Sequence, residues 1–145
     1  MRMAGLIVLA AALAPTGCGE AETPRETVGP GEGLGQAFYQ LGERSGLCSA
    51  SDNRAAFVIY GEGDTNCMAQ GSIEVDANGG MALAPRGDAD CRIPIEDLGQ
   101  SIRLSNGGEA CTYYCGGTAV YAGRELTKNW DETPDLRDAA GEPIC

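Results

Sequence analysis

The sequence predicts a mainly β fold, a small antiparallel meander or barrel of about six strands with one N-terminal helix and three disulfides. From Ala55 onward, apolar residues recur at every second position in short runs, the period of a strand with one buried face. Turn signals rich in glycine, aspartate and asparagine separate these runs. Six cysteines beyond Cys18 are available to link the strands.

The chain before the β region divides into a leader and a tether. Residues 1–17 carry one positive charge at Arg2, an apolar run and a small-residue site, the order of an export signal. The apolar run is shorter than the about 20 residues that a membrane-spanning helix needs. Residues 18–33 are rich in Gly, Glu, Pro and Thr and predict a flexible tether. Residues 34–145 are then expected to form one disulfide-tied β domain.

Cys18 stands directly after the predicted signal. The segment Ala14-Pro15-Thr16-Gly17-Cys18 resembles the lipobox of bacterial lipoproteins, in which a diacylglycerol group is attached to the cysteine and the signal is cut just before it. Pro15 departs from the pattern, which usually has Leu there, so an ordinary secreted protein with a free Cys18 is the alternative. The resemblance implies lipidation of Cys18 and attachment to a membrane. Because Gly19 is not aspartate, it also implies the periplasmic face of the outer membrane.

The predicted domain opens with a helical pattern. Leu34, Ala37, Phe38 and Leu41 are spaced i, i+3, i+4 and i+7, which places their side chains on one face of a helix. Ser45-Gly46 is typical of a helix end, because glycine adopts the left-handed conformation easily. We therefore expect a packing helix here.

Six strands are expected after this helix. The first is a short apolar run at residues 57–60, and the next four are alternating runs at 72–75, 81–84, 91–96 and 101–105. A last strand is expected over residues 119–126. The turn signals between them are Gly61-Glu62-Gly63-Asp64, Asp76 to Gly80, Arg86-Gly87-Asp88, Leu98-Gly99 and Asn106-Gly107-Gly108. Connections this short require antiparallel neighbours, because parallel strands need a crossover of a dozen or more residues.

Two of the turns resemble each other. Residues 63–67 and 87–91 share the order Gly, Asp, any residue, Asn or Asp, Cys, and residues 108–111 form a looser third copy. The pattern is either a relic of duplicated hairpins or a common form of strand entry in a glycine-rich chain. Alternate turns of a meander lie at the same end of the sheet. Cys67, Cys91 and Cys111 should therefore gather at one end.

The cysteines are expected to be oxidised. An export signal indicates an oxidising compartment, where six cysteines form three disulfides. Sequence alone leaves fifteen pairings open, and the pairing that we favour is Cys67 with Cys91, Cys111 with Cys115 and Cys48 with Cys145.

Metal binding is the competing use of these residues, and we expect no metal. Cys111 and Cys115 are close in sequence, but the spacing set of structural zinc is not met and histidine is absent. Calcium would need a complete loop pattern, which is lacking around the candidate oxygen ligands Asp64, Asn66, Asp88 and Asp90.

The chain has no histidine, which excludes Ser-His-Asp and Cys-His catalysis. Carboxylate chemistry on sugars remains, because it needs only two acids beside one bond. Neighbouring acids occur at Glu62 with Asp64, Asp88 with Asp90, and Glu96 with Asp97. They fall in turns or on exposed strand positions, where acids mostly serve solubility. We therefore expect no catalytic residue and no cofactor.

The formal charge is −11, and cleavage before Cys18 would remove Arg2 and no acid. A surface this negative repels nucleic acid and steers cationic partners toward it. A basic envelope protein is thus the expected partner, besides the membrane reached through the lipid anchor. The aromatic residues best able to form a contact patch are Tyr113, Tyr114, Tyr121 and Trp130, although packing under the C-terminal loop is the expected role of Trp130.

Residues 48–128, with Asn66-Cys67-Met68-Ala69-Gln70-Gly71 and Cys111-Thr112-Tyr113-Tyr114-Cys115-Gly116-Gly117, resemble small cysteine-rich lipoproteins of Gram-negative bacteria, a group with no assigned activity. In expected architecture the domain is more loosely similar to periplasmic lysozyme-inhibitor lipoproteins. The acidity, the tether and the lack of catalytic groups favour a non-enzymatic binding module of the cell envelope. The alternative is a carboxylate-dependent enzyme that acts on cell-wall sugars, which would require two acids facing one cleft.

Overall fold

The computed structural model describes residues 32–131 and 135–145. The predicted signal peptide 1–17, Cys18 and the tether up to residue 31 lie outside the described residues. Within the described part, no helix is both long and apolar enough to cross a membrane.

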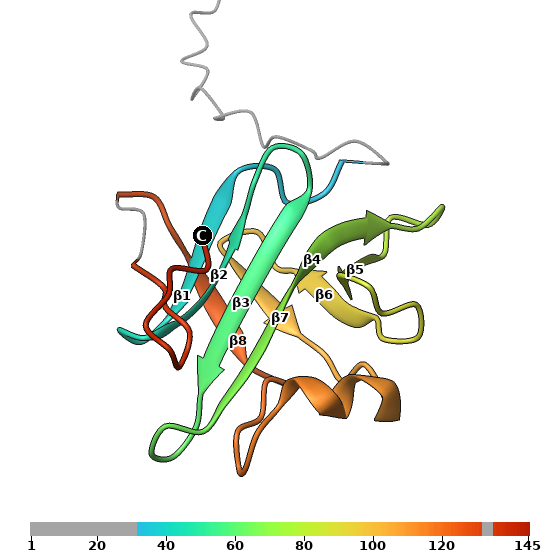
Figure 1. Ribbon diagram of the computed structural model, residues 1–145. Coiled ribbons are helices and arrows are strands. Elements are labelled where there is room, and N and C mark those ends of the chain that lie inside the picture. The colour runs from blue at the N-terminus through green and yellow to red at the C-terminus, as the bar shows by residue number, and fades with distance from the viewer. Residues whose placement is uncertain (1–31, 132–134) are drawn as a thin grey trace, which may run out of the picture.

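Eight antiparallel strands form a closed barrel in which each strand pairs with its neighbours in sequence and β8 pairs with β1 (Figure 1). The strands are β1 (Ala37–Leu41), β2 (Ser45–Ser49), β3 (Arg54–Tyr60), β4 (Asn66–Val75), β5 (Met81–Pro85), β6 (Ile93–Asp97), β7 (Ser101–Leu104) and β8 (Glu125–Asn129). One short 3-10 helix, η1 (Glu109–Tyr114), lies between β7 and β8. The mainly β prediction is confirmed.

The predicted N-terminal helix is wrong, because β1 and β2 occupy that part of the chain. The turn between them contains Gly42, whose φ of 70° suits glycine. Tyr39 points into the barrel and is only 2% exposed, whereas Phe38 packs in an apolar cluster on the outer side. Apolar side chains on both faces of β1 produced a spacing that also fits a helix.

The predicted count of about six strands is wrong, because the barrel has eight: β1 and β2 lie where a helix was expected. The last predicted strand is also displaced along the chain. The expected strand 119–126 corresponds to β8 at Glu125–Asn129. Ala119 and Tyr121 are buried, but they belong to the connection that packs on the barrel core. The Tyr121 hydroxyl accepts a hydrogen bond from the backbone N–H of Gly107 at 3.2 Å.

Apolar side chains fill the barrel interior. The largest of them are at most 1% exposed: Leu47, Phe57, Ile59, Leu83, Ile93, Ile102, Leu104 and Leu126. They come from six of the eight strands, so the core joins strands from all sides of the barrel. A ligand or partner must therefore be sought on the outside.

The C-terminal segment 135–145 packs on the outer face of β1 to β3. Leu136 is 1% exposed and lies in a second apolar cluster with Cys48 and Val58. A Cβ added to Gly46 would lie 3.0 Å from the Leu136 side chain, so the glycine allows this close approach. The disulfide between Cys48 and Cys145 fastens the segment, as predicted.

Candidate functional site

The connections β3–β4, β5–β6 and β7–β8 meet at one end of the barrel, which we call the capped end. The helix η1 crosses it, at the lower side of Figure 1. Two disulfides, Cys67–Cys115 and Cys91–Cys111, tie this helix and its C-terminal neighbour to the start of β4 and to the loop before β6. Cys67, Cys91 and Cys111 therefore gather at one end, as predicted, and all three are fully buried.

The predicted pairs Cys67–Cys91 and Cys111–Cys115 are wrong. Cys67 begins β4 and Cys91 precedes β6, and β5 lies between these strands. Two strand spacings amount to about 9 to 10 Å, beyond the about 7 Å between Cα atoms that a disulfide tolerates. The backbone of Cys115 is extended and forms an isolated antiparallel bridge with Cys67, which brings these two cysteines together for their disulfide. Cys111 joins the interior cluster together with Cys91.

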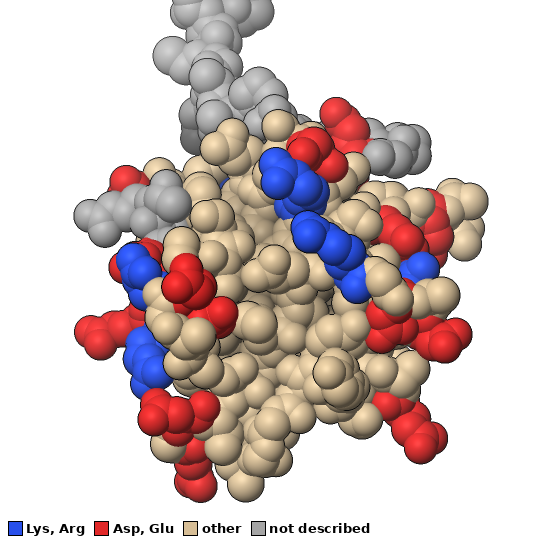
Figure 2. Space-filling view, viewed as in Figure 1, with Lys and Arg blue, Asp and Glu red and all other residues tan. Residues whose placement is uncertain are grey.

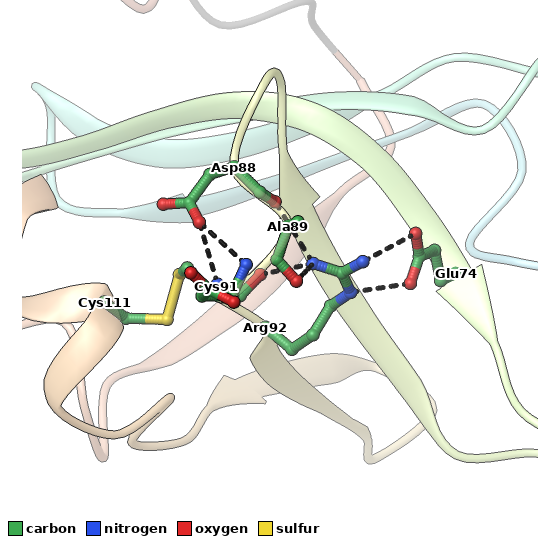
Figure 3. A network of polar contacts seen from close by, with 7 residues as sticks. Glu74, Asp88, Ala89, Cys91, Arg92 and Cys111 are labelled. Carbon is green, nitrogen blue, oxygen red and sulfur yellow. Dashed lines mark hydrogen bonds and ion pairs between the residues drawn. A yellow bond between two sulfur atoms is a disulfide. The ribbon is translucent and has the colours of Figure 1, made fainter.

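A polar network holds the loop that carries Cys91 (Figure 3). Asp88 Oδ1 accepts hydrogen bonds from the backbone N–H groups of Asp90 at 2.9 Å and Cys91 at 3.0 Å. Its Oδ2 accepts the hydroxyl of Tyr114, on η1, at 2.9 Å. Asp88 thus connects the β5–β6 loop to the helix beside the disulfide.

Arg92 completes this network from the other side. Its guanidinium contacts both carboxylate oxygens of Glu74, the closer at 2.7 Å, and donates to the Cys91 carbonyl at 2.7 Å (Figure 3). It also reaches the carbonyls of Asp88 and Ala89, each at 3.3 Å. Because the planar guanidinium has five donors in a fixed geometry, lysine could not reproduce these contacts.

These contacts shift two pKa values in opposite directions. The backbone N–H of Cys91, then that of Asp90, then the Tyr114 hydroxyl lower the pKa of Asp88. Burial, followed by the hydrogen bond to Asp88, raises the pKa of Tyr114 to about 12. The Asp88 contribution to stability is present above the ordinary carboxyl pKa of about 4 and is lost as the pH falls through the lower folded-state value.

We therefore expect the free energy of unfolding of Asp88→Asn to fall less steeply than that of the parent as the pH is lowered below about 4. The asparagine carbonyl oxygen can still accept the two backbone hydrogen bonds, but it carries no charge to lose. Urea midpoints measured from about pH 6 down to about pH 2 test this expectation. Asp90→Asn is the matched control, since the Asp90 carboxylate accepts no hydrogen bond from the described residues. Urea midpoints of Asp88→Asn that fall with decreasing pH as steeply as those of the parent would contradict this expectation.

A shallow groove of about 780 Å³ opens beside η1. The β3–β4 turn and the start of β4 form one wall, including Asp64 and Met68, and Tyr113, Tyr114 and Gly117 form the other. Tyr113 is 88% exposed, more than the other exposed large apolar residues of the described chain, Leu98, Val120 and Trp130. Its ring packs edge-on against that of Tyr114 at 5.7 Å.

The predicted aromatic residues do not form one patch. Tyr113 and Tyr114 lie together at the capped end, whereas Tyr121 is buried against Phe57. Trp130 follows β8 at the opposite end of the barrel and is 67% exposed, so its expected packing under the C-terminal loop is wrong. Its indole N–H points to Gln100 Oε1 at 3.4 Å, and Lys128 Nζ lies 4.1 Å from the ring centre.

The acids considered for sugar chemistry lie at the surface. Glu62, Asp64, Asp90, Glu96 and Asp97 are exposed, and Asp88 is half-buried. Asp64 pairs with Arg44 at 3.4 Å and Glu96 with Arg103 at 2.9 Å. The lowered pKa of Asp88 is opposite to what a general acid needs. In residues 32–131 and 135–145, no three His, Cys, Asp or Glu side chains are grouped as a metal site.

The fold and the capped end together define a closed eight-stranded barrel with a disulfide-stapled cap. No family model, curated protein or solved structure matches the chain. The likeness to lysozyme-inhibitor lipoproteins stays a prediction from the sequence.

Proposed function

We propose that this protein is a non-enzymatic, lipid-anchored module of the cell envelope that binds a basic partner protein at its capped end, in the manner of lysozyme inhibitors. The observation that carries the proposal is Tyr113, which is 88% exposed beside a groove, on a helix held by one disulfide within it and by another directly after it. Tyrosine is enriched among the residues that dominate binding energies at protein interfaces. Fixing its backbone lowers the entropy lost on binding.

The charge of the chain supports a basic partner. The formal charge is −11, and Glu62, Asp90 and Glu109 at the capped end form no ion pair with described residues. Acidic side chains also stand around the margin of the face seen in Figure 2. Such a distribution raises the association rate of a cationic protein more than it raises the final affinity.

The position of the capped end fits an anchor at Cys18 on the periplasmic face of the outer membrane. The domain begins at β1, and the first residue of β1 lies at the end of the barrel opposite η1. A lipid on Cys18 and a flexible tether over residues 18–33 would therefore join the domain at the end opposite the capped end and leave the capped end accessible to a partner. Stable anchoring needs more than one acyl chain, which lipoprotein modification supplies.

The test uses the full chain with Cys18→Ser and a basic lysozyme as the probe. We expect binding that weakens as salt is raised, and Tyr113→Ala should weaken it by roughly tenfold or more. Trp130→Ala is the matched control, because it removes an exposed aromatic ring at the opposite end. Lysozyme with acylated lysines should bind poorly. The proposal fails if Tyr113→Ala binds as tightly as the parent, or if neither this probe nor other basic envelope proteins bind.

A further inference from the structure

A second groove lies away from the capped end, on the outer face of β1 to β4. Its floor is a row of outward-facing neighbours in register: Phe38 opposite Cys48, Cys48 opposite Ala56, and Ala56 opposite Gln70. Ile144 and Cys145 of the C-terminal segment form one wall. The volume of the groove is about 250 Å³. The floor is thus mostly apolar and crosses four strands.

Two arginines, Arg54 and Arg86, are among the residues that line this groove. Arg54 Nε lies 2.6 Å from Asp52 Oδ2, so part of its charge is compensated. The Arg86 backbone N–H is bonded to the Gln70 carbonyl at 2.9 Å, which fixes where its side chain begins. Its guanidinium makes no hydrogen bond or ion pair with any residue that the structure describes.

The setting of these arginines is unusual for this chain. Acidic residues outnumber basic ones by 21 to 10, yet the residues that line the groove include two arginines and no aspartate or glutamate. In Figure 2, the face over β3 and β4 is largely uncharged, with basic side chains gathered in its upper part and acidic ones around its margin. An unpaired guanidinium beside an apolar floor is complementary to a ligand with an anionic head and an apolar body.

We propose that this groove binds a small anionic amphiphile through Arg86, with Arg54 as the second cation and the apolar body against Phe38, Ala56 and Ile144. The volume is below the about 300 to 1,000 Å³ of ordinary ligand pockets, which favours a short body. Guanidinium groups bind carboxylates in a bidentate manner, so a carboxylate is the head group that we infer. The inference does not depend on the proposed function of the capped end.

The test measures octanoate binding to the full chain with Cys18→Ser by calorimetry and by chemical-shift changes. We expect octanoate to bind, octanol to bind at least about tenfold more weakly, and octylamine not to bind. Arg86→Gln should reduce octanoate affinity by about tenfold, with shifts lost around Ala56 and Ile144. Arg124→Gln is the matched control, because it removes one exposed arginine at the capped end and changes the net charge equally.

Three results would overturn the inference. One is octanoate binding that Arg86→Gln leaves unchanged, and another is equal affinity for octanoate and octanol. The third is a change of oligomeric state in Arg86→Gln without a change in octanoate affinity, which would assign the groove to a second copy of the chain. If octyl phosphate displaced octanoate, the proposal of an anion-binding groove would stand, but the inference that its ligand carries a carboxylate would be wrong. Tyr113→Ala should leave octanoate binding intact, so failure here is distinguishable from failure at the capped end.

Discussion

Removing either disulfide of the capped end is expected to lower the free energy of unfolding by several kcal/mol. Cys91 and Cys111 are 20 residues apart and Cys67 and Cys115 are 48 apart. In the chain-entropy model these loops correspond to about 3 and about 4 kcal/mol. A domain of this size is typically stable by about 5 to 15 kcal/mol, so each bond is a large share and reduction of all three should unfold the protein.

The variants to measure are Cys91→Ala/Cys111→Ala and Cys67→Ala/Cys115→Ala, with alanine chosen because these sites are largely apolar. Urea unfolding gives the change in free energy. Val120→Ala is the control, since Val120 lies in the same connection and is half exposed; it should change stability by less than about 0.5 kcal/mol. Unfolding midpoints equal to the parent's would contradict the expectation.

The pairing itself has a direct test. Tryptic digestion without reduction should give one complex of the three peptides 55–86, 87–92 and 104–124, because Cys111 and Cys115 lie in the same peptide and bind different partners. Peptide 45–54 should be linked to peptide 138–145. A complex of only 55–86 with 87–92, and 104–124 closed on itself, would restore the pairing expected from the sequence.

Gly71→Ala is expected to destabilise the barrel by about 3 kcal/mol, opposite to the usual effect of replacing a strand glycine. Gly71 pairs with Ala55 on β3 and with Pro85 on β5, at the point where β4 passes from one neighbour to the other. A Cβ at this position would collide with the Ala84 carbonyl and lie 2.8 Å from Pro85 Cα. Backbone atoms cannot move aside as a flexible side chain can.

Urea unfolding of Gly71→Ala against Gly116→Ala isolates this effect. The nearest atom to a Cβ at Gly116 is a carbonyl oxygen 3.8 Å away, so alanine fits there without a clash. The control should be neutral within about 0.5 kcal/mol. If Gly71→Ala were neutral or stabilising, β4 and β5 would not approach each other as closely as described.

Five strands could be predicted from the sequence. β4 to β7 each overlap one of the alternating runs, and β3 overlaps the continuous apolar run 57–60, which fits its burial on both faces. Glycines with positive φ occur in the expected turns, as at Gly79 and Gly99. β2 gave no such signal, since all five of its residues are buried between the barrel core and the C-terminal segment. Alternation disappears when both faces are covered.

The candidate site was predictable in part. The turn repeat indicated that Cys67, Cys91 and Cys111 share one end, but it could not show that β5 separates two of them. Nothing in the sequence distinguished the exposed Tyr113 from the buried Tyr121, because their exposure depends on how a connection without regular period folds over the core. The arginine-bordered groove was missed because Arg54 and Arg86 meet only through strand pairing.

The closure of β8 on β1 also limits the order in which the barrel can fold. Phe38 pairs with Asn129, and Cys48 is linked to Cys145, 97 positions later in the chain. Such long-range contacts form slowly, because a large loop must be closed first. Until β8 is in place, the sheet has two unpaired edges, which attract other strands. A chain that ends before residue 125 therefore exposes an aggregation-prone sheet and does not form a smaller barrel.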